Sequence, residues 1–315
     1  MSELCYLGVD TSCYTTSLAL VDARGETLAD QRMLLPVPAG GLGLRQSDGV
    51  FHHVRQLPQL LQRLPLAAMR LEAVGVSARP CPTGESYMPV FLAGVLAAQA
   101  VAVTRGVPLY RFSHQEGHIS AGLTTTPDRP FLAVHISGGT SDLLLVQPDA
   151  AAGFQIQQLA GSSDLNAGQM IDRVGVALGL PFPAGPHLER LASAAEGRLK
   201  LPSAVADLSF SFSGPCSAAL RLIGQGEDGQ EVAYAVLRVV ANSLEKVLRA
   251  AKLRFGISTA LLVGGVLSNQ LIRQRLSHRL DRAMQLVYAP PELCSDNAVG
   301  IARLARRQHQ SQQLR

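Results

Sequence analysis

Two histidines four residues apart mark the segment of the sequence with the clearest potential for metal chemistry. His114 and His118 enclose the run HQEGH. If this segment is helical, residues four apart lie on one face, and both imidazoles can present a nitrogen to one divalent ion. Two histidines do not complete a metal site, and polar surface histidines are the alternative. His135 and Asp296 are further candidates, although His135 could be a core histidine and Asp296 the N-cap of the last helix.

Two glycine-containing turns could hold a nucleotide. Ser137, Gly138 and Gly139 form a small, donor-rich turn, and glycines let backbone N–H groups approach phosphate oxygens closely. A second segment, GGVLSN at residues 264–269, lacks the ending of a Walker A loop and the third glycine of a dinucleotide fingerprint. Its glycine pair would still let an adenine or ribose reach the backbone. Turns without any ligand explain both segments equally well.

Strands alternating with helices would position these residues. Apolar runs at 4–9 and 17–21 predict a β-hairpin, and the same pattern at 131–136 and 142–146 predicts a second one, which suggests a duplicated architecture. Further predicted strands cover 73–77, 260–264 and 285–289, and predicted helices cover 91–104, 231–253 and 297–308. Segments 36–45 and 79–89 are rich in Gly and Pro and predict surface loops. The pattern indicates an α/β fold.

Composition limits the class of protein. A chain of 315 residues with 47% hydrophobic residues can build two cores. We expect a cytoplasmic protein, because the sequence contains neither a membrane-length apolar run nor a secretory leader. The five cysteines, Cys5, Cys13, Cys81, Cys216 and Cys294, form no CxxC pair, so we expect reduced thiols. A net charge of +4 permits RNA binding, but an ordinary solvated surface explains it too.

Other catalytic classes find little support in the sequence. No Ser/His/Asp triad can be identified, and spacing does not establish which carboxylates meet. The scattered candidates are Asp10, Asp142, Asp164, Asp172 and Asp296.

Eight short motifs agree, in order and over nearly the whole chain, with those of one protein family. They are GVDTSCYTTSLAL at residues 8–20, SHQEGH at 113–118, HISGGTSDLLL at 135–145, DLNAGQMIDR at 164–173, PAGP at 183–186, LSFSFSG at 208–214, GGVLSN at 264–269 and CSDN at 294–297. The sequence thus resembles the TsaD family of the actin-like, sugar-kinase and heat-shock-chaperone ATPase superfamily. Its members transfer a threonylcarbamoyl group from its adenylate to N6 of the adenosine beside the anticodon of certain tRNAs.

The resemblance implies an α/β fold of two similar lobes with duplicated subdomains around a central nucleotide cleft. Residues 1–108 would form lobe I with the first phosphate hairpin, completed by a C-terminal helix at 296–315. Residues 109–295 would form lobe II with the metal, second phosphate and adenosine motifs. The implied partners are tRNA and either TsaB-like and TsaE-like proteins or a second TsaD-type paralogue, with no membrane.

By motif, the resemblance also implies the ligands. His114, His118 and Asp296 would bind one divalent metal ion, iron in preference to zinc, with His135 as an extra ligand. The bound nucleotide would be ATP or a carbamoyl-adenylate. Its phosphates would meet His135, Ile136, Ser137, Gly138 and Gly139, its ribose Asp172 and Gly185, and its adenosine Gly264, Gly265 and Asn269.

Some positions depart from the family pattern. Tyr14 and Thr15 stand where two acidic residues are usual, Thr140 replaces a His or Asn, and Pro215 and Cys216 replace a Leu-Lys pair. These changes resemble a divergent paralogue of the kind associated with Gram-positive bacteria, and they leave the acceptor open.

Two functions therefore compete. The favoured one is a metal-dependent threonylcarbamoyl, or related carbamoyl or acyl, transferase, because the metal and phosphate motifs are retained. The other is a catalytically impaired nucleotide- and metal-binding partner of a genuine transferase. A peptidase is least favoured, because no HExxH motif or nucleophile and base pair accompanies the histidines.

Overall fold

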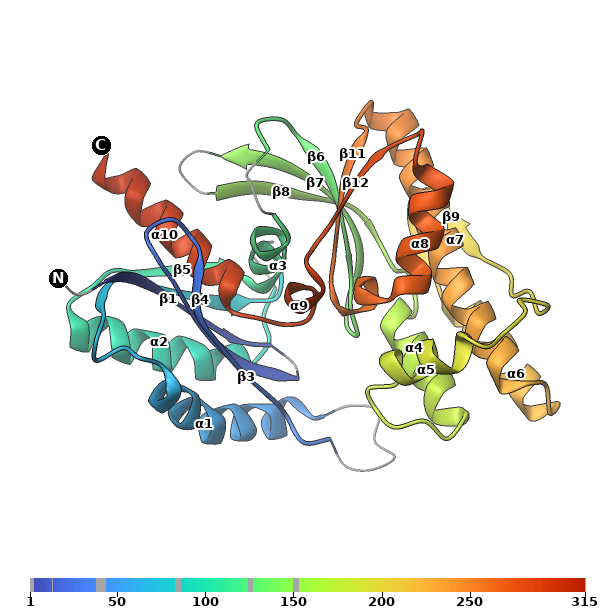
Figure 1. Cartoon of the computed structure of the whole chain (residues 1–315), viewed down its shortest axis with the longest axis horizontal. Helices are drawn as coiled ribbons and strands as arrows, with labels where there is room; N and C mark the ends of the chain where they lie inside the picture. The colour runs from blue at the N-terminus through green and yellow to red at the C-terminus, as the bar shows by residue number, and fades with distance from the viewer. Residues whose placement is uncertain are drawn as a thin grey trace.

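The computed structural model describes residues 3–12, 14–37, 44–82, 86–123, 127–149 and 153–314 (Figure 1). Cys13, predicted to be a reduced thiol, lies outside the described residues, as do parts of the predicted loops 36–45 and 79–89. Cys5, Cys216 and Cys294 are buried free thiols, as expected.

The first sheet has five strands in the order β3-β2-β1-β4-β5. Its strands are β1 (Leu4–Thr11), β2 (Thr15–Val21), β3 (Thr27–Leu34), β4 (Arg70–Arg79) and β5 (Leu109–Ser113). The antiparallel pair β1 and β2 is the predicted first hairpin. Nearly every residue of β1 and β2 is buried, as expected for strands covered on both faces. Because β5 pairs with β4, this sheet extends beyond residue 108, the expected end of lobe I.

The second sheet repeats that plan in the order β12-β11-β6-β7-β8. It contains β6 (Phe131–Ile136), β7 (Ser141–Asp149), β8 (Gly153–Gly161), β11 (Thr259–Val263) and β12 (Gln285–Tyr288). Strands β6 and β7 form the predicted second hairpin, β8 extends it in antiparallel fashion, and β11 and β12 add in parallel. The duplicated architecture expected from the two hairpins is therefore confirmed.

Helices α3 (His114–Gly122) and α10 (Val299–Gln313) lie between the two sheets. Ile119 and Ile301 belong to an apolar cluster that includes Tyr6 from the first sheet and Phe131 and Leu144 from the second. On the outer face of the first sheet lie α1 (Gln46–Arg63) and α2 (Phe91–Arg105) (Figure 1). The molecule is thus layered, and the middle layer joins its two halves.

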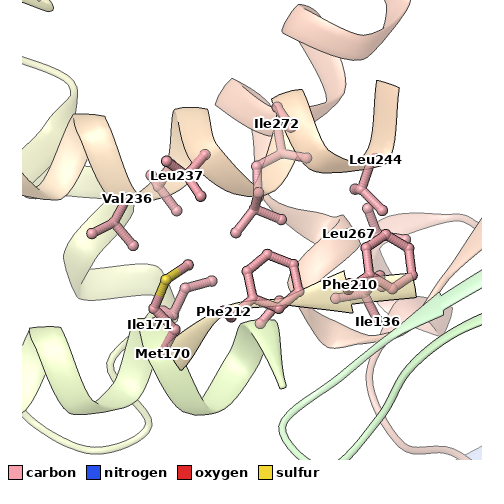
Figure 2. Close-up of a cluster of buried hydrophobic side chains, with 14 of the residues drawn as sticks. Ile136, Met170, Ile171, Phe210, Phe212, Val236, Leu237, Leu244, Leu267 and Ile272 are labelled. Carbon is pink, nitrogen blue, oxygen red and sulfur yellow. The ribbon is translucent and has the colours of Figure 1, made fainter. Parts of the chain in front are cut away.

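The outer face of the second sheet is covered by a larger helical group (Figure 1). It comprises α4 (Ala167–Ala177), α5 (Gly185–Ala192), α6 (Ser213–Gly224), α7 (Gly229–Phe255) and α8 (Gln270–Leu280), with a small hairpin of β9 (Ala204–Ala206) and β10 (Ser209–Ser211). Figure 2 shows the core beneath these helices, where Phe210 and Phe212 pack with Met170 of α4 and Ile272 of α8. A 3-10 turn, η1 (Gly265–Ser268), and the short α9 (Pro291–Cys294) complete the described elements. Among them we find no helix that combines the length and the apolarity needed to cross a membrane.

Candidate metal centre and substrate cavity

The HQEGH segment forms a helix because Ser113 caps it. The Ser113 hydroxyl accepts a hydrogen bond from the Glu116 backbone N–H at 3.2 Å, and the Glu116 carboxylate accepts one from the Ser113 N–H at 2.6 Å. This reciprocal capping box starts α3 at His114. His114 and His118 consequently share one face, with their Nε2 atoms 3.0 Å apart.

Asp296 completes a compact set of three possible ligands. Its Oδ1 lies 3.5 Å from Nε2 of His114 and 3.4 Å from Nε2 of His118. The donor atoms of all three side chains lie within 4.8 Å of one another. Asn297 caps α10 instead of Asp296, because its Oδ1 accepts hydrogen bonds from the N–H groups of Val299 and Gly300. The N-cap alternative for Asp296 therefore does not apply.

His135 lies beside this set on β6. Its ring centroid is 4.6 Å from that of His118 and 6.4 Å from that of His114. Both of its ring nitrogens are buried and, within the described residues, have no hydrogen-bond partner. A core histidine would need such a partner, because an unsatisfied buried polar atom is costly. The orphaned nitrogens fit a metal ion close by, although His135 falls outside the compact set, and its ligand role stays a prediction.

Asp10, at the end of β1, was one of several scattered carboxylates in the sequence. The structure places its Oδ1 2.9 Å from Nδ1 of His114, and the Ser77 hydroxyl donates to the same oxygen. A carboxylate on the far nitrogen fixes the orientation of a ligating imidazole. The Ser12 hydroxyl similarly donates to Oδ2 of Asp296 at 2.9 Å.

Charge is concentrated in this cluster. Burial disfavours the imidazolium form of His114, but the carboxylates of Asp10 and Asp296 outweigh burial and raise its pKa to about 10. Burial and the neighbouring His114 lower the pKa of His118, and burial holds the pKa of His135 well below its usual value. The imidazoles of His114 and His118 together with the carboxylate of Asp296 are a donor set that suits a divalent transition metal.

A cavity of about 430 Å³ opens beside the three possible ligands. His114, His135 and Asp296 line one side. The backbone turn through Gly138 and Gly139 lines another, and a side chain built at either glycine would meet no atom within 4 Å. The turn therefore leaves open space in which a ligand could approach its backbone.

The N-terminus of α4 supports this turn. Asn166 Nδ2 donates to the Gly139 carbonyl at 2.9 Å, and the Ala167 N–H donates to the Ser141 hydroxyl at 3.0 Å. A Cβ at Gly168 would lie 2.4 Å from the Ser137 carbonyl oxygen, so the helix and the turn touch through backbone. The N-terminus of α4 thus holds the predicted phosphate-binding turn in place.

Two aromatic rings in the cavity lining contact each other edge to face. Tyr14, from the first hairpin, and Phe182, from the segment before α5, both line it, with ring centroids 5.9 Å apart. Thr15, the second departure from the family's acidic pair, is buried on β2. The cavity therefore has an aromatic ring at a position where the family pattern has a carboxylate.

The predicted nucleotide residues divide into two groups. His135, Ser137, Gly138, Gly139 and Asp172 line the cavity, whereas Ile136, Gly185, Gly264, Gly265 and Asn269 lie outside its lining. Gly264 has φ +102°, and a Cβ there would lie 2.3 Å from the Ile136 carbonyl oxygen, so only glycine fits where β11 ends beside β6. Asn269 caps α8 by accepting a hydrogen bond from the Ile272 N–H at 3.0 Å. Asp172 accepts one from the Ala184 N–H at 2.8 Å, next to Gly185.

Asp142 also belongs to the cavity, whereas Asp164 does not. Gln115 and Gln158 donate to the two oxygens of Asp142 at 3.1 and 2.9 Å, and burial raises its pKa to about 6. Asp164 accepts hydrogen bonds from the end of β10 and the residues after it, including the Ser211 hydroxyl at 2.7 Å. The sequence signal for Asp142 was its place in the predicted second hairpin, where it lies opposite His135.

Most of the chain is similar to known proteins. The family model for TsaD, tRNA N6-adenosine threonylcarbamoyltransferase, matches residues 52–303. A protein of that description from Geobacillus thermodenitrificans is 33% identical over 96% of this chain and 91% of its own length. A second, from Geobacillus kaustophilus, is also 33% identical, over 96% of this chain and 91% of its own length.

Solved structures share the fold at low identity. HypF from T. kodakarensis superposes with a TM-score of 0.65 and 12% identity over 97% of this chain and 48% of its own. Component A of the (R)-2-hydroxyglutaryl-CoA dehydratase of Acidaminococcus fermentans superposes with a TM-score of 0.61 and 16% identity, over 98% of this chain and 99% of its own. A ROK family glucokinase from Streptomyces griseus, solved with glucose and AMPPNP, superposes with a TM-score of 0.56 and 15% identity, over 96% of this chain and 99% of its own. The fold is therefore that of the actin-like and sugar-kinase ATPases.

Proposed function

Because the chain belongs to the TsaD family, we propose that it is a metal-dependent transferase that moves a threonylcarbamoyl, or related carbamoyl or acyl, group onto N6 of a tRNA adenosine. The observation that carries this proposal is the convergence of His114, His118 and Asp296 beside a cavity that is lined by the first and last of them and by an open glycine turn. The relatives of 33% identity carry the name of this transferase.

The reaction joins an amine to an activated carbonyl carbon. A C–N bond forms between N6 of adenosine and the carbamoyl carbon, the bond from that carbon to the phosphate oxygen of the adenylate breaks, and the amine loses a proton. When bound, the metal ion would supply Lewis-acid stabilisation of negative charge on oxygen. We propose His114, His118 and Asp296 as its ligands, with His135 as a fourth and iron favoured over zinc.

The chain's own residues would do the positioning. Gly138 and Gly139 would offer backbone N–H groups to the adenylate phosphate, and Asp172 and Gly185 would lie at its ribose. Gly264, Gly265 and Asn269 would hold its adenosine. Holding donor and acceptor in one orientation is a large part of catalysis in group transfer. We also propose that the protein acts in the cytoplasm.

A second candidate function rests on Tyr14 and Thr15. The Tyr14 ring faces Phe182 in the cavity, where the family pattern has an acidic side chain. A chain that lacks these carboxylates could bind nucleotide and metal without turnover, as a partner of TsaB-like and TsaE-like proteins or of an active paralogue.

One reconstitution separates the two candidates. Purified protein would be incubated anaerobically with metal, bicarbonate, threonine, ATP, the synthase that makes threonylcarbamoyl-adenylate, and unmodified tRNA, followed by nucleoside mass spectrometry. Threonylcarbamoyladenosine above a control without this protein supports the transferase. If no modified nucleoside forms while adenylate still binds, the partner function replaces it.

The fourth ligand has its own test. His135→Ala is expected to weaken metal binding in equilibrium dialysis while the metal-to-protein ratio at saturation stays at one. Unchanged metal affinity in this variant would remove His135 from the ligand set.

A further inference from the structure

A groove runs between α7 and α8 on the outer side of the second half of the molecule. Two adjoining hollows of about 260 and 220 Å³ share Arg238 of α7 and Arg275 of α8. We call them together the α7–α8 groove. Lys200 and His278 also line it, and none of its lining residues is Asp or Glu.

The two arginines of the groove have neutral partners. Arg238 donates to the backbone carbonyls of Gly197, at 3.0 Å, and Leu199. Arg275 donates through Nε to the side-chain oxygen of Asn242 at 2.9 Å. These bonds fix the guanidinium groups in place without cancelling their charge, so the groove presents a fixed positive field.

The carboxylates closest along α7 are already engaged. Glu245 pairs with Arg249 at 3.0 Å and with Arg279 at 2.8 Å. Glu231 accepts the backbone N–H groups of residues 196–199 and is buried. Neither side chain lines the groove, and the positive charge there remains available to an external anion.

The lining repeats along both helices. Tyr234, Arg238 and Asn242 follow one another at four-residue intervals on α7, and Leu271, Arg275 and His278 do so at three to four residues on α8. Each interval advances by about 5 to 6 Å, so the groove is an elongated track instead of a single-ion pocket. The Arg238 guanidinium lies 5.5 Å from the centre of the Tyr234 ring, which further restrains it.

We propose that the α7–α8 groove binds the phosphate backbone of the RNA whose adenosine is modified. This inference rests on the proposed function, which requires a large polyanion to dock on the protein. The groove starts at Leu271, two residues after Asn269, so it adjoins the predicted adenosine-binding turn. A track of fixed cations without acidic residues is complementary to phosphates and reads no base.

The test measures binding of an unmodified tRNA transcript to the full chain by fluorescence anisotropy over a range of KCl concentrations. Gln274 also lines the groove, so Gln274→Glu adds a negative charge there and removes no hydrogen bond that involves a groove cation. Lys200→Gln with Arg275→Gln removes two positive charges. Arg63→Gln with Arg129→Gln is the matched control, because both arginines are exposed and lie on other segments of the chain.

We expect the groove double variant to bind tRNA about tenfold more weakly at low salt. Its plot of log Kd against log salt concentration should be shallower by about 1 to 2, since each lost phosphate contact removes about 0.7 to 0.9. Gln274→Glu should weaken binding in the same direction. The control pair should stay within about twofold of the unaltered protein, and thermal melts would verify that every variant is folded.

Equal tRNA affinity in groove and control variants would overturn the proposal. So would a poly-glutamate peptide that binds the groove when tRNA does not, since the surface would then serve an acidic protein. Failure of the transferase proposal gives a different result: the groove variants still lose tRNA binding, but the unaltered protein makes no modified nucleoside. Conversely, if the groove variants form product with an unchanged KM for tRNA, the groove proposal is wrong and the transferase proposal stands.

Discussion

The chemistry open to the candidate metal centre depends on which nitrogen of each histidine faces Asp296. Nδ1 of His114 is occupied by Asp10 at 2.9 Å, which leaves Nε2 for a metal. Nε2 of His118 points to the same place, 3.4 Å from Oδ1 of Asp296. A carboxylate behind one imidazole raises its basicity and fixes its orientation, so Asp10 tunes the site without being one of the proposed ligands.

Substitution of a ligand should remove the metal without unfolding the protein. We expect His114→Ala and Asp296→Asn to lower bound metal, measured by plasma mass spectrometry, from about one per chain to less than about a tenth. His187→Ala serves as the control, because His187 lies outside the cavity lining and pairs with Arg190. Stoichiometric metal in either ligand variant would contradict the assignment.

Asp142 should make the stability of the protein depend on pH. Its pKa is about 6 in the folded protein against 3.8 ordinarily, because burial disfavours the carboxylate. Between about pH 4 and pH 6 the folded chain therefore holds a proton that the unfolded chain has lost, and the free energy of unfolding falls as pH rises.

The Asp142→Asn variant cannot bind this proton, so its free energy of unfolding should not show this fall as pH rises. Relative to the variant, the natural protein should lose about 2 kcal/mol between pH 4 and pH 7 in urea unfolding. The difference between the two proteins cancels the titration of all other groups. A difference that stays constant across this range would show that Asp142 ionises normally.

At the residue level, the sequence indicated the side chains that the structure brings together, but not the residues that support them. His114 and His118 could be paired because four residues make about one helical turn. The roles of Asp10 and Ser12 depend on contacts with His114 and Asp296, about 100 and 280 positions away in the chain, which no local pattern encodes. The glycine of GGVLSN at 264 was expected to serve a nucleotide, and the structure also gives it a steric role against Ile136.

At the scale of elements, α10 reaches the metal centre because glycines let it approach its neighbours. A Cβ at Gly300 would lie 1.9 Å from the Gly117 carbonyl oxygen of α3, and one at Gly8 would lie 2.2 Å from the Ala298 carbonyl oxygen. Backbone contacts of this kind hold Asp296, just before α10, over the histidines of α3.

Gly300→Ala should therefore destabilise the protein, although alanine favours helices. The helix propensity gain of about 1 kcal/mol is opposed by a backbone clash that forces α10 away from α3. We expect a net loss of about 2 kcal/mol in urea unfolding, together with weaker metal binding as Asp296 moves. Gly224→Ala in α6, where a Cβ meets no atom within 4 Å, should be neutral or stabilising. Similar stability changes in both variants would contradict the packing argument.

Elements with a clear apolar pattern were predictable, and polar or very short ones were not. The hairpins, β4, β11, β12 and the helices α2, α7 and α10 have apolar patterns that match their observed positions. Strand β3, however, is mostly half-buried and reads DQR at its centre, so no alternation marks it. Strand β5 is five residues long and leads directly into α3. A pattern this short does not indicate where a lobe ends.

At the scale of the whole molecule, the metal site joins segments that are distant along the chain. His114 and His118 belong to the start of α3, whereas Asp296 precedes α10, and both helices are packed between the two sheets. The apolar cluster around Ile119 and Ile301 draws residues from both sheets, so this middle cluster joins the two halves. Binding at this junction should therefore stabilise the whole fold and not just one half.

Removal of the metal tests this coupling. A ligand that binds only the folded chain adds about 2.7 kcal/mol to the free energy of unfolding when its concentration is one hundred times its Kd. For a chain of this size, that gain raises Tm by a few degrees. We expect a chelator to lower Tm by that amount in a single cooperative transition. His114→Ala should melt at the chelated temperature with or without added metal. Two separate transitions, only one of them sensitive to metal, would instead show that the halves unfold independently and that the middle layer does not couple them.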